Sequence, residues 1–185
     1  LNESFPVNTQ LRFDVGKALH RMVQDKLGNA GVLFGVWECG RHPGTLTTGF
    51  KPQEACPACQ EQGWYPKWQY REVQVVDEEL WIVGETDGIV VVNQRKYIFE
   101  FKTINNDGYS TLVEPLNHHK HQAMWYLDVL DRNRRKQEEQ FMGLQAKGEN
   151  VDVQLQVTRM PFSGVIFLYM NKDNQNLREF HMDGG

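Results

Sequence analysis

Apolar residues near the start of the chain recur at the spacing of a helix. Intervals of three and four residues predict a helix over residues 10–27, which Gly28-Asn29 then stops. The residues that carry this pattern are Leu11, Val15, Leu19, Met22, Val23 and Leu27. A stretch rich in Gly, Pro and Cys follows from about 36 to 66, where little periodicity remains. It predicts an insertion built from loops.

From residue 70 the pattern changes to short runs of Val, Ile and aromatic residues, which predict strands. The predicted strands cover residues 70–76, 80–84, 88–92 and 96–102. Asn93-Gln94 is a plausible turn that joins the last two strands as a hairpin.

Helical spacing returns over residues 117–131, at Met124, Trp125, Leu127 and Leu130. The polar stretch 132–150 predicts an extension of this helix and then a mobile loop. A final hairpin is predicted from strands 154–160 and 165–171, with its turn at 161–164. The order of elements predicts one α+β or α/β domain over residues 1–185.

Composition narrows the classes of protein that fit. The chain has 185 residues, is 40% hydrophobic and 24% charged, and is long enough for one domain with a core. It contains no apolar run that spans a bilayer and begins without a signal peptide, so we expect a cytoplasmic protein with no membrane partner. The net charge of −4 argues against a wholly basic protein that coats nucleic acid.

Ionisable residues face one another in the predicted hairpin. A turn centred on Asn93-Gln94 places Asp87 opposite Glu100. Because side chains alternate along a strand, Glu100 and Lys102 share one face. Two carboxylates can bind a divalent cation, and a nearby ammonium can orient a water molecule.

A solvent-exposed Glu–Lys pair across strands is the simpler interpretation of these charges. The strand that carries them, residues 97–102, is however apolar on both faces until the charges begin. Strands of that kind are usually buried on both sides, and burying unpaired charge is costly. We therefore favour a functional site.

These residues belong to an ordered set of motifs that resembles the PD-(D/E)XK nuclease core, and its RecB-like branch in particular. The set comprises His20 on an early helix, Gly84 to Asp87 before a strand, Glu100-Phe101-Lys102 on the next strand, and Gln122 to Tyr126 on a later helix. It covers roughly residues 10–172 and is closest to phage-type RecB-like exonucleases and CRISPR-associated members. The resemblance implies a restriction-endonuclease-like core, with a central mixed sheet flanked by helices.

The resemblance also implies roles for these residues. Asp87 and Glu100, with the Phe101 carbonyl and His20, would bind Mg²⁺ or Mn²⁺, and Lys102 would position or help deprotonate the attacking water. Gln122 and Tyr126 would reach the substrate phosphate or brace the site. A hydrogen-bonded pair at the rim is the alternative for Gln122 and Tyr126, and a satisfied half-buried histidine is the alternative for His20.

Further polar residues lie near these motifs. Glu72 is a candidate for an additional carboxylate, whereas Glu85 is expected to face solvent. His118, His119 and His121 cannot easily share one ion, because adjacent helical residues point in different directions. Together with Lys120, they predict that the start of this helix carries positive charge and lies near DNA phosphates.

The cysteines lie within the predicted insertion. Cys39-x₂-His42 and Cys56-x₂-Cys59 are separated by thirteen residues, a spacing that indicates a structural zinc site instead of three free thiols. The iron–sulfur members of the family carry cysteines after the nuclease core, and none follows Cys59 here, so no such cluster is expected. Aromatic and basic residues follow: Trp64, Tyr65, Lys67, Trp68, Tyr70 and Arg71. They could equally stack on single-stranded bases or pack the insertion on the sheet.

The leading hypothesis is a DNA nuclease that depends on Mg²⁺ or Mn²⁺ and is exonucleolytic or acts on single strands and ends. One alternative is a catalytically silent, nuclease-fold module that binds DNA. Another is a subunit of a larger recombination complex, with protein partners in replication or recombination. An oligomer is compatible with each hypothesis, and a phage-encoded protein would act in the host cytoplasm.

Overall fold

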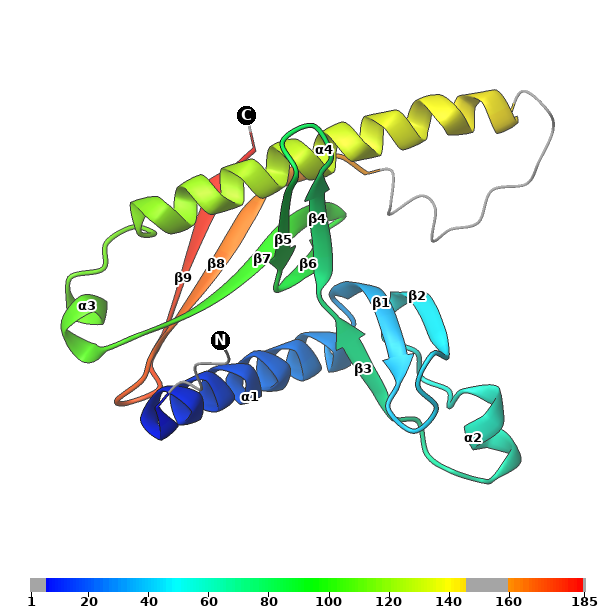
Figure 1. Ribbon diagram of the computed structural model, residues 1–185, viewed down its shortest axis with the longest axis horizontal. Coiled ribbons are helices and arrows are strands. Elements are labelled where there is room, and N and C mark those ends of the chain that lie inside the picture. Colours follow the sequence, from blue (N-terminus) through cyan, green and yellow to red (C-terminus); the bar gives the residue numbers. More distant parts are fainter. Residues whose placement is uncertain (1–5, 146–159, 185) are drawn as a thin grey trace.

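A seven-stranded mixed sheet forms the centre of the computed structural model, which describes residues 6–145 and 160–184. Helices α1 (Val7–Asn29) and α4 (Asn117–Gln145) cover its opposite faces (Figure 1). The predicted α+β class, with a central mixed sheet flanked by helices, is thereby confirmed. No helix among the described residues is long and apolar enough to cross a membrane.

The strands follow the order β2-β1-β6-β7-β8-β9, and β3 also pairs with β1. Their bounds are β1 Leu33–Cys39, β2 Leu46–Phe50, β3 Trp68–Arg71, β6 Gly88–Val92, β7 Arg95–Ile104, β8 Phe162–Asn171 and β9 Leu177–Asp183. Strands β7 and β8 run parallel, and the other neighbours are antiparallel. A separate two-stranded sheet contains β4 (Val73–Asp77) and β5 (Ile82–Thr86). The short helices are α2 (Pro57–Glu61) and α3 (Asn106–Ser110).

Alternation along β7 divides the core into two layers. Phe99 and Phe101 join the cluster that contains Val23 of α1, whereas Ile98 joins the cluster that contains Val129 of α4. Successive side chains of a strand point to opposite faces, so this one strand supplies both layers. Burial on both faces explains why its sequence is apolar almost throughout.

The hairpin predicted at Asn93-Gln94 is confirmed. Both residues have positive φ, 49° and 61°, as the tight turn of a two-residue hairpin requires. The pairing places Gly88 opposite Phe99, which is the predicted register. Asp87 and Glu100 are the next residues along this hairpin.

The first helix is confirmed, and α1 is longer than predicted at both ends. Of its patterned apolar residues, Val23 is buried, and Leu19 and Leu27 are partly buried against the same core. Other residues of the apolar pattern are exposed, with Leu11 at 56% and Val15 at 58%. The buried residues lie in the C-terminal half of α1, which packs on β1 and β3.

The predicted loop-built insertion is wrong for part of its length. Strand β2 and helix α2 lie within it, and strand β1, which starts before it at Leu33, extends into it as a member of the central sheet. Four of the first five residues of β1, Leu33, Phe34, Gly35 and Trp37, are buried, so no alternation reveals this strand. The predicted strand 70–76 is also interrupted at Glu72, which separates β3 from β4. Strand β5 starts at Ile82, after Trp81 with its φ of 55°, and not at residue 80.

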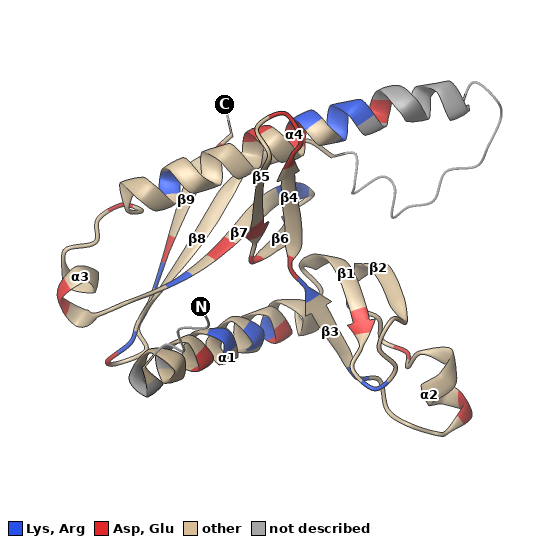
Figure 2. Cartoon of the chain, viewed as in Figure 1, with Lys and Arg blue, Asp and Glu red and all other residues tan. Residues whose placement is uncertain are grey.

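The C-terminal hairpin is corrected as well. Residues 162–164 belong to β8 and are not a turn, and β8 pairs with β7 and with β9, a strand that was not predicted. The predicted strand 154–160 and the mobile loop fall largely on residues 146–159, outside the described residues. The helix extension is confirmed, because α4 reaches Gln145. Residues of both charge signs follow one another along α4 (Figure 2). Opposite charges three or four residues apart support the extension, as between Arg134 and Glu138 at 2.7 Å.

Candidate functional site

Asp87 connects helix α1 to strand β7. It follows β5 directly, at the point where the pairing of β6 with β7 ends. Its Oδ2 accepts a hydrogen bond from the Phe101 backbone N–H at 2.7 Å, and its Oδ1 lies 3.0 Å from His20 Nδ1. The pKa of His20 is raised, chiefly by this hydrogen bond. The imidazole is half-buried and hydrogen bonds to Asp87, which matches the alternative interpretation of His20 as a satisfied histidine. A role of His20 as a metal ligand stays a prediction.

Glu100 and Lys102 form a buried ion pair beside Asp87. Glu100 Oε2 lies 2.6 Å from Lys102 Nζ, and Glu100 is 2% exposed. Burial raises the pKa of Glu100 to about 7, and the charge of Asp87 adds to the effect while Lys102 opposes it. Burial alone would lower the pKa of Lys102, but the charges of Glu100 and Asp87 raise it, so the ammonium stays protonated.

The second oxygen of Glu100 lacks a partner. Its Oε1 is buried and accepts no hydrogen bond from the part of the chain that the structure describes. A buried acceptor without a donor is costly, and an orphaned oxygen beside a second carboxylate matches the oxygen ligands that Mg²⁺ and Mn²⁺ prefer. The unpartnered oxygen of Glu100 is thus a possible cation ligand, but Glu100 lies outside the group of possible ligands that the structure brings together, which comprises His20, Glu72 and Asp87.

A second set of groups meets Asp87 from the side of α1. Ligand atoms of His20, Glu72 and Asp87 all lie within 4.8 Å of one another. The amide of Gln24 donates to the Asp87 carbonyl at 2.9 Å and to Glu72 Oε1 at 3.3 Å. Burial raises the pKa of Glu72, and the charge of Asp87 adds to it. The additional carboxylate is therefore near the site, although it lies at the break between β3 and β4.

Gln24 was not predicted as a site residue. It is 5% exposed and follows His20 by four residues, so both project from one side of α1. That spacing was the available signal, but Gln24 also needed Asp87 and Glu72 to be brought to it. Glu85 is exposed on β5, as expected.

Gln122 and Tyr126 lie one helical turn apart on α4 and bind each other. The Gln122 amide donates to the Tyr126 hydroxyl at 2.8 Å, and Tyr126 is 2% exposed. Burial raises the pKa of Tyr126, and the charge of Glu100 raises it further. This matches the hydrogen-bonded pair that was the alternative to a substrate contact. A contact with substrate stays a prediction.

The histidines at the start of α4 do not form a metal site with one another. His119 Nδ1 lies 2.7 Å from the Tyr169 hydroxyl, and its ring packs beside His118. Burial lowers the pKa of His119 to about 4, and the charge of Lys102 contributes. His119 is therefore neutral and adds no positive charge to the helix start, which corrects that part of the prediction.

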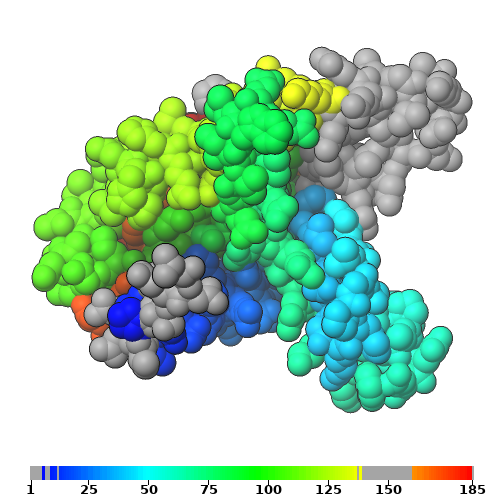
Figure 3. Space-filling view, viewed as in Figure 1, coloured from blue at the N-terminus to red at the C-terminus, as the bar shows by residue number. Residues whose placement is uncertain are grey.

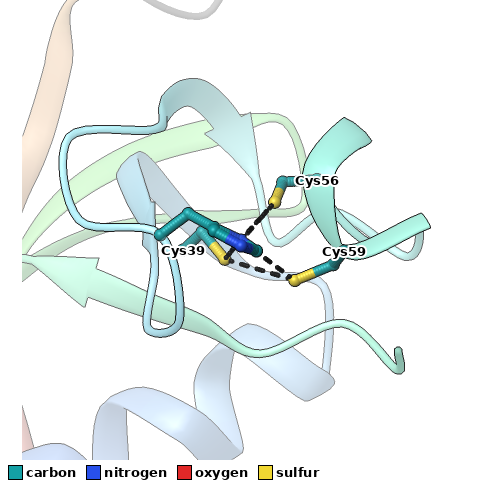
Figure 4. Close-up of side chains that lie close together, drawn as sticks. Cys39, Cys56 and Cys59 are labelled. Carbon is teal, nitrogen blue, oxygen red and sulfur yellow. Dashed lines mark hydrogen bonds between the residues drawn. The ribbon is translucent and has the colours of Figure 1, made fainter. Parts of the chain in front are cut away.

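The three cysteines and His42 converge from separate segments. Cys39 ends β1, and Cys56 and Cys59 come from the start of α2 (Figure 4). Their sulfur atoms lie 3.5 and 3.8 Å from Cys39 Sγ, and His42 Nδ1 lies 3.3–3.7 Å from all three. Ligands about 2.0–2.3 Å from a tetrahedral zinc ion are separated by roughly these distances. The four side chains form a group that can hold a structural zinc ion.

Backbone donors prepare one of these sulfur atoms for a metal. Burial favours the neutral Cys39 thiol, but the backbone N–H groups of Arg41 and His42 hydrogen bond to it, and its pKa falls to about 6. A thiolate is the form that binds zinc. The local turn therefore favours the thiolate at Cys39, whereas burial raises the pKa of Cys59.

The aromatic residues after the cysteines divide into two groups. Trp68 and Tyr70 pack the insertion on the sheet, since Trp68 Nε1 donates to Glu54 O at 2.7 Å and the Tyr70 hydroxyl donates to Phe34 O at 2.9 Å. Trp64 and Tyr65 are 45% and 85% exposed. The two interpretations of this stretch thus apply to different residues, and base stacking is a hypothesis for the exposed pair alone.

A cleft of about 1560 Å³ leads to Asp87. Its walls include α1, residues 34–36 of β1, and the region where β3 meets β4. His20, Glu72 and Asp87 line it together. Figure 3 shows this hollow between α1 (blue) and the strands β4 and β5 (green). The cleft thus reaches Asp87 from the side of α1, whereas Glu100 and Lys102 do not line it.

Comparisons with known proteins do not identify a family. No family model matches the chain, and no curated protein matches it. A solved structure of a protein named SSO0001 resembles it with a TM-score of 0.41 and 16% sequence identity. The match covers 91% of this chain and 50% of that one, so this chain spans half of that protein's length. A likeness of this size assigns no function.

Proposed function

We propose that this protein is a metal-dependent nuclease that hydrolyses phosphodiester bonds in DNA. The observation that carries the proposal is the buried, unpartnered Oε1 of Glu100, next to the Lys102 ammonium and the Asp87 carboxylate. A buried charge cluster of this kind is costly to the fold, and such clusters are found where ions are bound or chemistry is done.

Asp87 and Glu100 would hold Mg²⁺ or Mn²⁺, with His20 and the Phe101 carbonyl as the remaining protein ligands. When bound, such an ion supplies Lewis acidity at the phosphate and lowers the pKa of its water. His20 and the Phe101 N–H already orient the Asp87 carboxylate. Held from two sides, Asp87 presents its oxygen atoms without reorganisation.

Lys102 is the residue that acts on the water and the phosphate. Its ammonium is held by Glu100 and stays protonated, so it can donate a hydrogen bond to the attacking water and steady negative charge that develops on the phosphate. Gln122 and Tyr126 would support the site from α4. Tyr126 is close enough that the charge of Glu100 raises its pKa and the charge of Lys102 lowers it.

We propose that the cysteine cluster holds one zinc ion with a structural role, because four protein ligands leave no open position for substrate. We also propose a cytoplasmic location. The three cysteines form no disulfide bond, which suits a reducing compartment.

Cleavage of labelled DNA tests the enzymatic proposal. Wild type should cut single- or double-stranded DNA when Mg²⁺ or Mn²⁺ is added, and Lys102→Ala should lower the rate by about 10²–10⁴-fold. Lys26→Ala is the matched control, since Lys26 is exposed in the last turn of α1. Cleavage by Lys102→Ala at the wild-type rate contradicts the proposal. DNA binding by wild type without any cleavage would instead favour the binding-module alternative.

A further inference from the structure

Helix α1 carries a row of apolar side chains on the side that faces away from the sheet. Leu11, Val15, Ala18 and Met22 follow one another at intervals of four, three and four residues, which places them along one line of the helix. All four are exposed, with Leu11 at 56%, Val15 at 58% and Met22 at 45%. With about 3.6 residues per turn, this line lies roughly opposite Leu27, which packs on the core. We call these four residues the outer stripe; α1 itself lies at the edge of the molecule (Figure 1).

The fold of a single chain does not account for the outer stripe. A helix that packs on a sheet with one face normally presents polar residues on the other face. Single exposed apolar side chains are common, but a contiguous row marks a surface that another protein covers. Alternating intervals of four and three residues are the spacing of the seam at which two helices pack side by side. The next position of this seam is Asp25, which pairs with Lys51 at 3.3 Å, so the stripe ends at Met22. The stripe therefore fits a helix as its partner.

Charged residues beside the outer stripe indicate which helix this is. Asp14 and Arg21 are exposed and lie seven residues apart, about two turns, along the same edge of the stripe. Among the described residues neither has an ion-pair partner. A second α1 that runs antiparallel, with a two-fold axis between Val15 and Ala18, brings the same edges of the two helices together. Asp14 of each copy then lies level with Arg21 of the other, so the edge of α1 is complementary in charge to itself.

A parallel pair of helices lacks this match. Residues five positions apart meet across a parallel seam, so Arg21 of one copy would lie beside Lys26 of the other, and two cations repel. The antiparallel pair also matches the stripe in size, because Val15 lies against the small Ala18. Both charge and shape therefore favour the antiparallel arrangement.

We propose that α1 pairs antiparallel with α1 of a second copy of this chain. The two outer stripes form the seam, and an Asp14–Arg21 ion pair closes it on each side of the two-fold axis. The seam is short, so the dissociation constant of the dimer is on the order of 10 μM. His20 and Gln24 project from the other side of α1, toward Asp87, so they take no part in the seam. The dimer does not depend on the proposed nuclease function.

Sedimentation velocity of the zinc-loaded, full chain tests the seam, at concentrations below and above this dissociation constant. Wild type should pass from monomer to dimer. Val15→Asp should weaken association about 100-fold or more, because it places a charge from each copy in an apolar contact. Val113→Asp is the matched control, since Val113 is 86% exposed and lies outside α1, and it should associate as wild type does. A wild type that stays monomeric overturns the proposal and leaves the stripe to a different partner. Association of Val15→Asp at wild-type strength also overturns it.

Reversal of the two charges tests the antiparallel arrangement. Asp14→Arg and Arg21→Asp should each weaken self-association about 10- to 100-fold, because two attractive pairs become two repulsive ones. An equimolar mixture of the two variants should dimerise as wild type does, since every Arg then meets an Asp of the other chain. Arg95→Asp makes the same charge change at the exposed start of β7 and should self-associate normally. A mixture that associates no better than its separate variants overturns the arrangement.

Discussion

At the scale of single residues, the site depends on Asp87. Both carboxylate oxygens and the backbone carbonyl are engaged, by Phe101, His20 and Gln24. The Phe101 N–H is available because β6 ends its pairing with β7 at Gly88. A strand end therefore supplies the donor that a continuous ladder would have used.

Gly84 shows how another motif residue acts through close packing. A Cβ there would lie 2.7 Å from Tyr126 Cε1 and 3.0 Å from a carbon of the Trp125 ring. The Gly84-to-Asp87 motif and the Gln122-to-Tyr126 motif thus touch in space. The glycine leaves room for the tyrosine that packs over it.

Gly84→Ala is expected to destabilise the protein by about 1–3 kcal/mol, because the buried ring of Tyr126 and the partly buried ring of Trp125 on α4 must shift. The free energy of unfolding in urea measures the change. Gly16→Ala is the control, since nothing lies within 4 Å of a Cβ at that position in α1. It should stabilise by roughly 0.5–1 kcal/mol through helix propensity. An unchanged stability for Gly84→Ala would show that the rings move freely.

At the scale of elements, the β4–β5 hairpin depends on α4. An isolated two-stranded hairpin is marginal in water, and Val75 of β4 is fully buried in the cluster beneath α4. Asp77 closes the hairpin, since its Oδ1 accepts from the N–H groups of Glu79 and Leu80 at 3.1 Å. Its Oδ2 accepts from Arg132 of α4 at 2.8 Å. This hairpin carries the segment that leads into Asp87.

The Asp77–Arg132 contact predicts a pH dependence of stability. The hydrogen bond from Arg132 holds the pKa of Asp77 below its usual value. A lowered carboxyl pKa stabilises the fold above the unfolded pKa of about 3.9 and loses that effect as pH falls through the folded value. Asp77→Asn should lower the melting temperature by several degrees at neutral pH, and the difference should narrow below about pH 4.

Thermal unfolding followed across this pH range checks the sign. Asp25→Asn is the control, because Asp25 is exposed and pairs with Lys51 at 3.3 Å on the surface. It should change the melting temperature little at any pH. A difference between wild type and Asp77→Asn that grows as pH falls would contradict the assignment.

At the scale of the whole molecule, the cysteine cluster is continuous with the main core. Cys39, Cys56 and Cys59 belong to the same buried cluster as Trp37 and Phe101. The metal group and the candidate active site thus share one hydrophobic layer between α1 and the sheet. Loss of the metal is expected to reach beyond the insertion.

Purified protein should contain about one zinc ion per chain. His42→Ala should lower the zinc content and destabilise the protein by about 4 kcal/mol or more, the size of effect reached when a bound metal is lost. His121→Ala is the control, since His121 is an exposed histidine on α4. Iron in place of zinc, or full zinc in His42→Ala, would refute the ligand set.

Local patterns in the sequence were sufficient for the register of the β6–β7 hairpin. A turn at Asn93-Gln94 already predicted that Gly88 lies opposite Phe99, next to Asp87 and Glu100, because hairpin pairing depends on neighbouring residues alone. The Cys-x₂-His and Cys-x₂-Cys spacings likewise grouped the metal ligands. The two ligands of each pair are separated by only two residues, so they are close together whatever the rest of the fold.

Long-range packing decided the rest. The parallel pairing of β7 with β8, the partnership of β8 with β9, and the contact of Gln24 with Asp87 join residues far apart in the chain. Which apolar residues of α1 are buried depends on where β1 and β3 lie, and the neutrality of His119 depends on burial near Lys102. Periodicity carries no information about such partners, so only the tertiary structure could reveal the cleft beside α1.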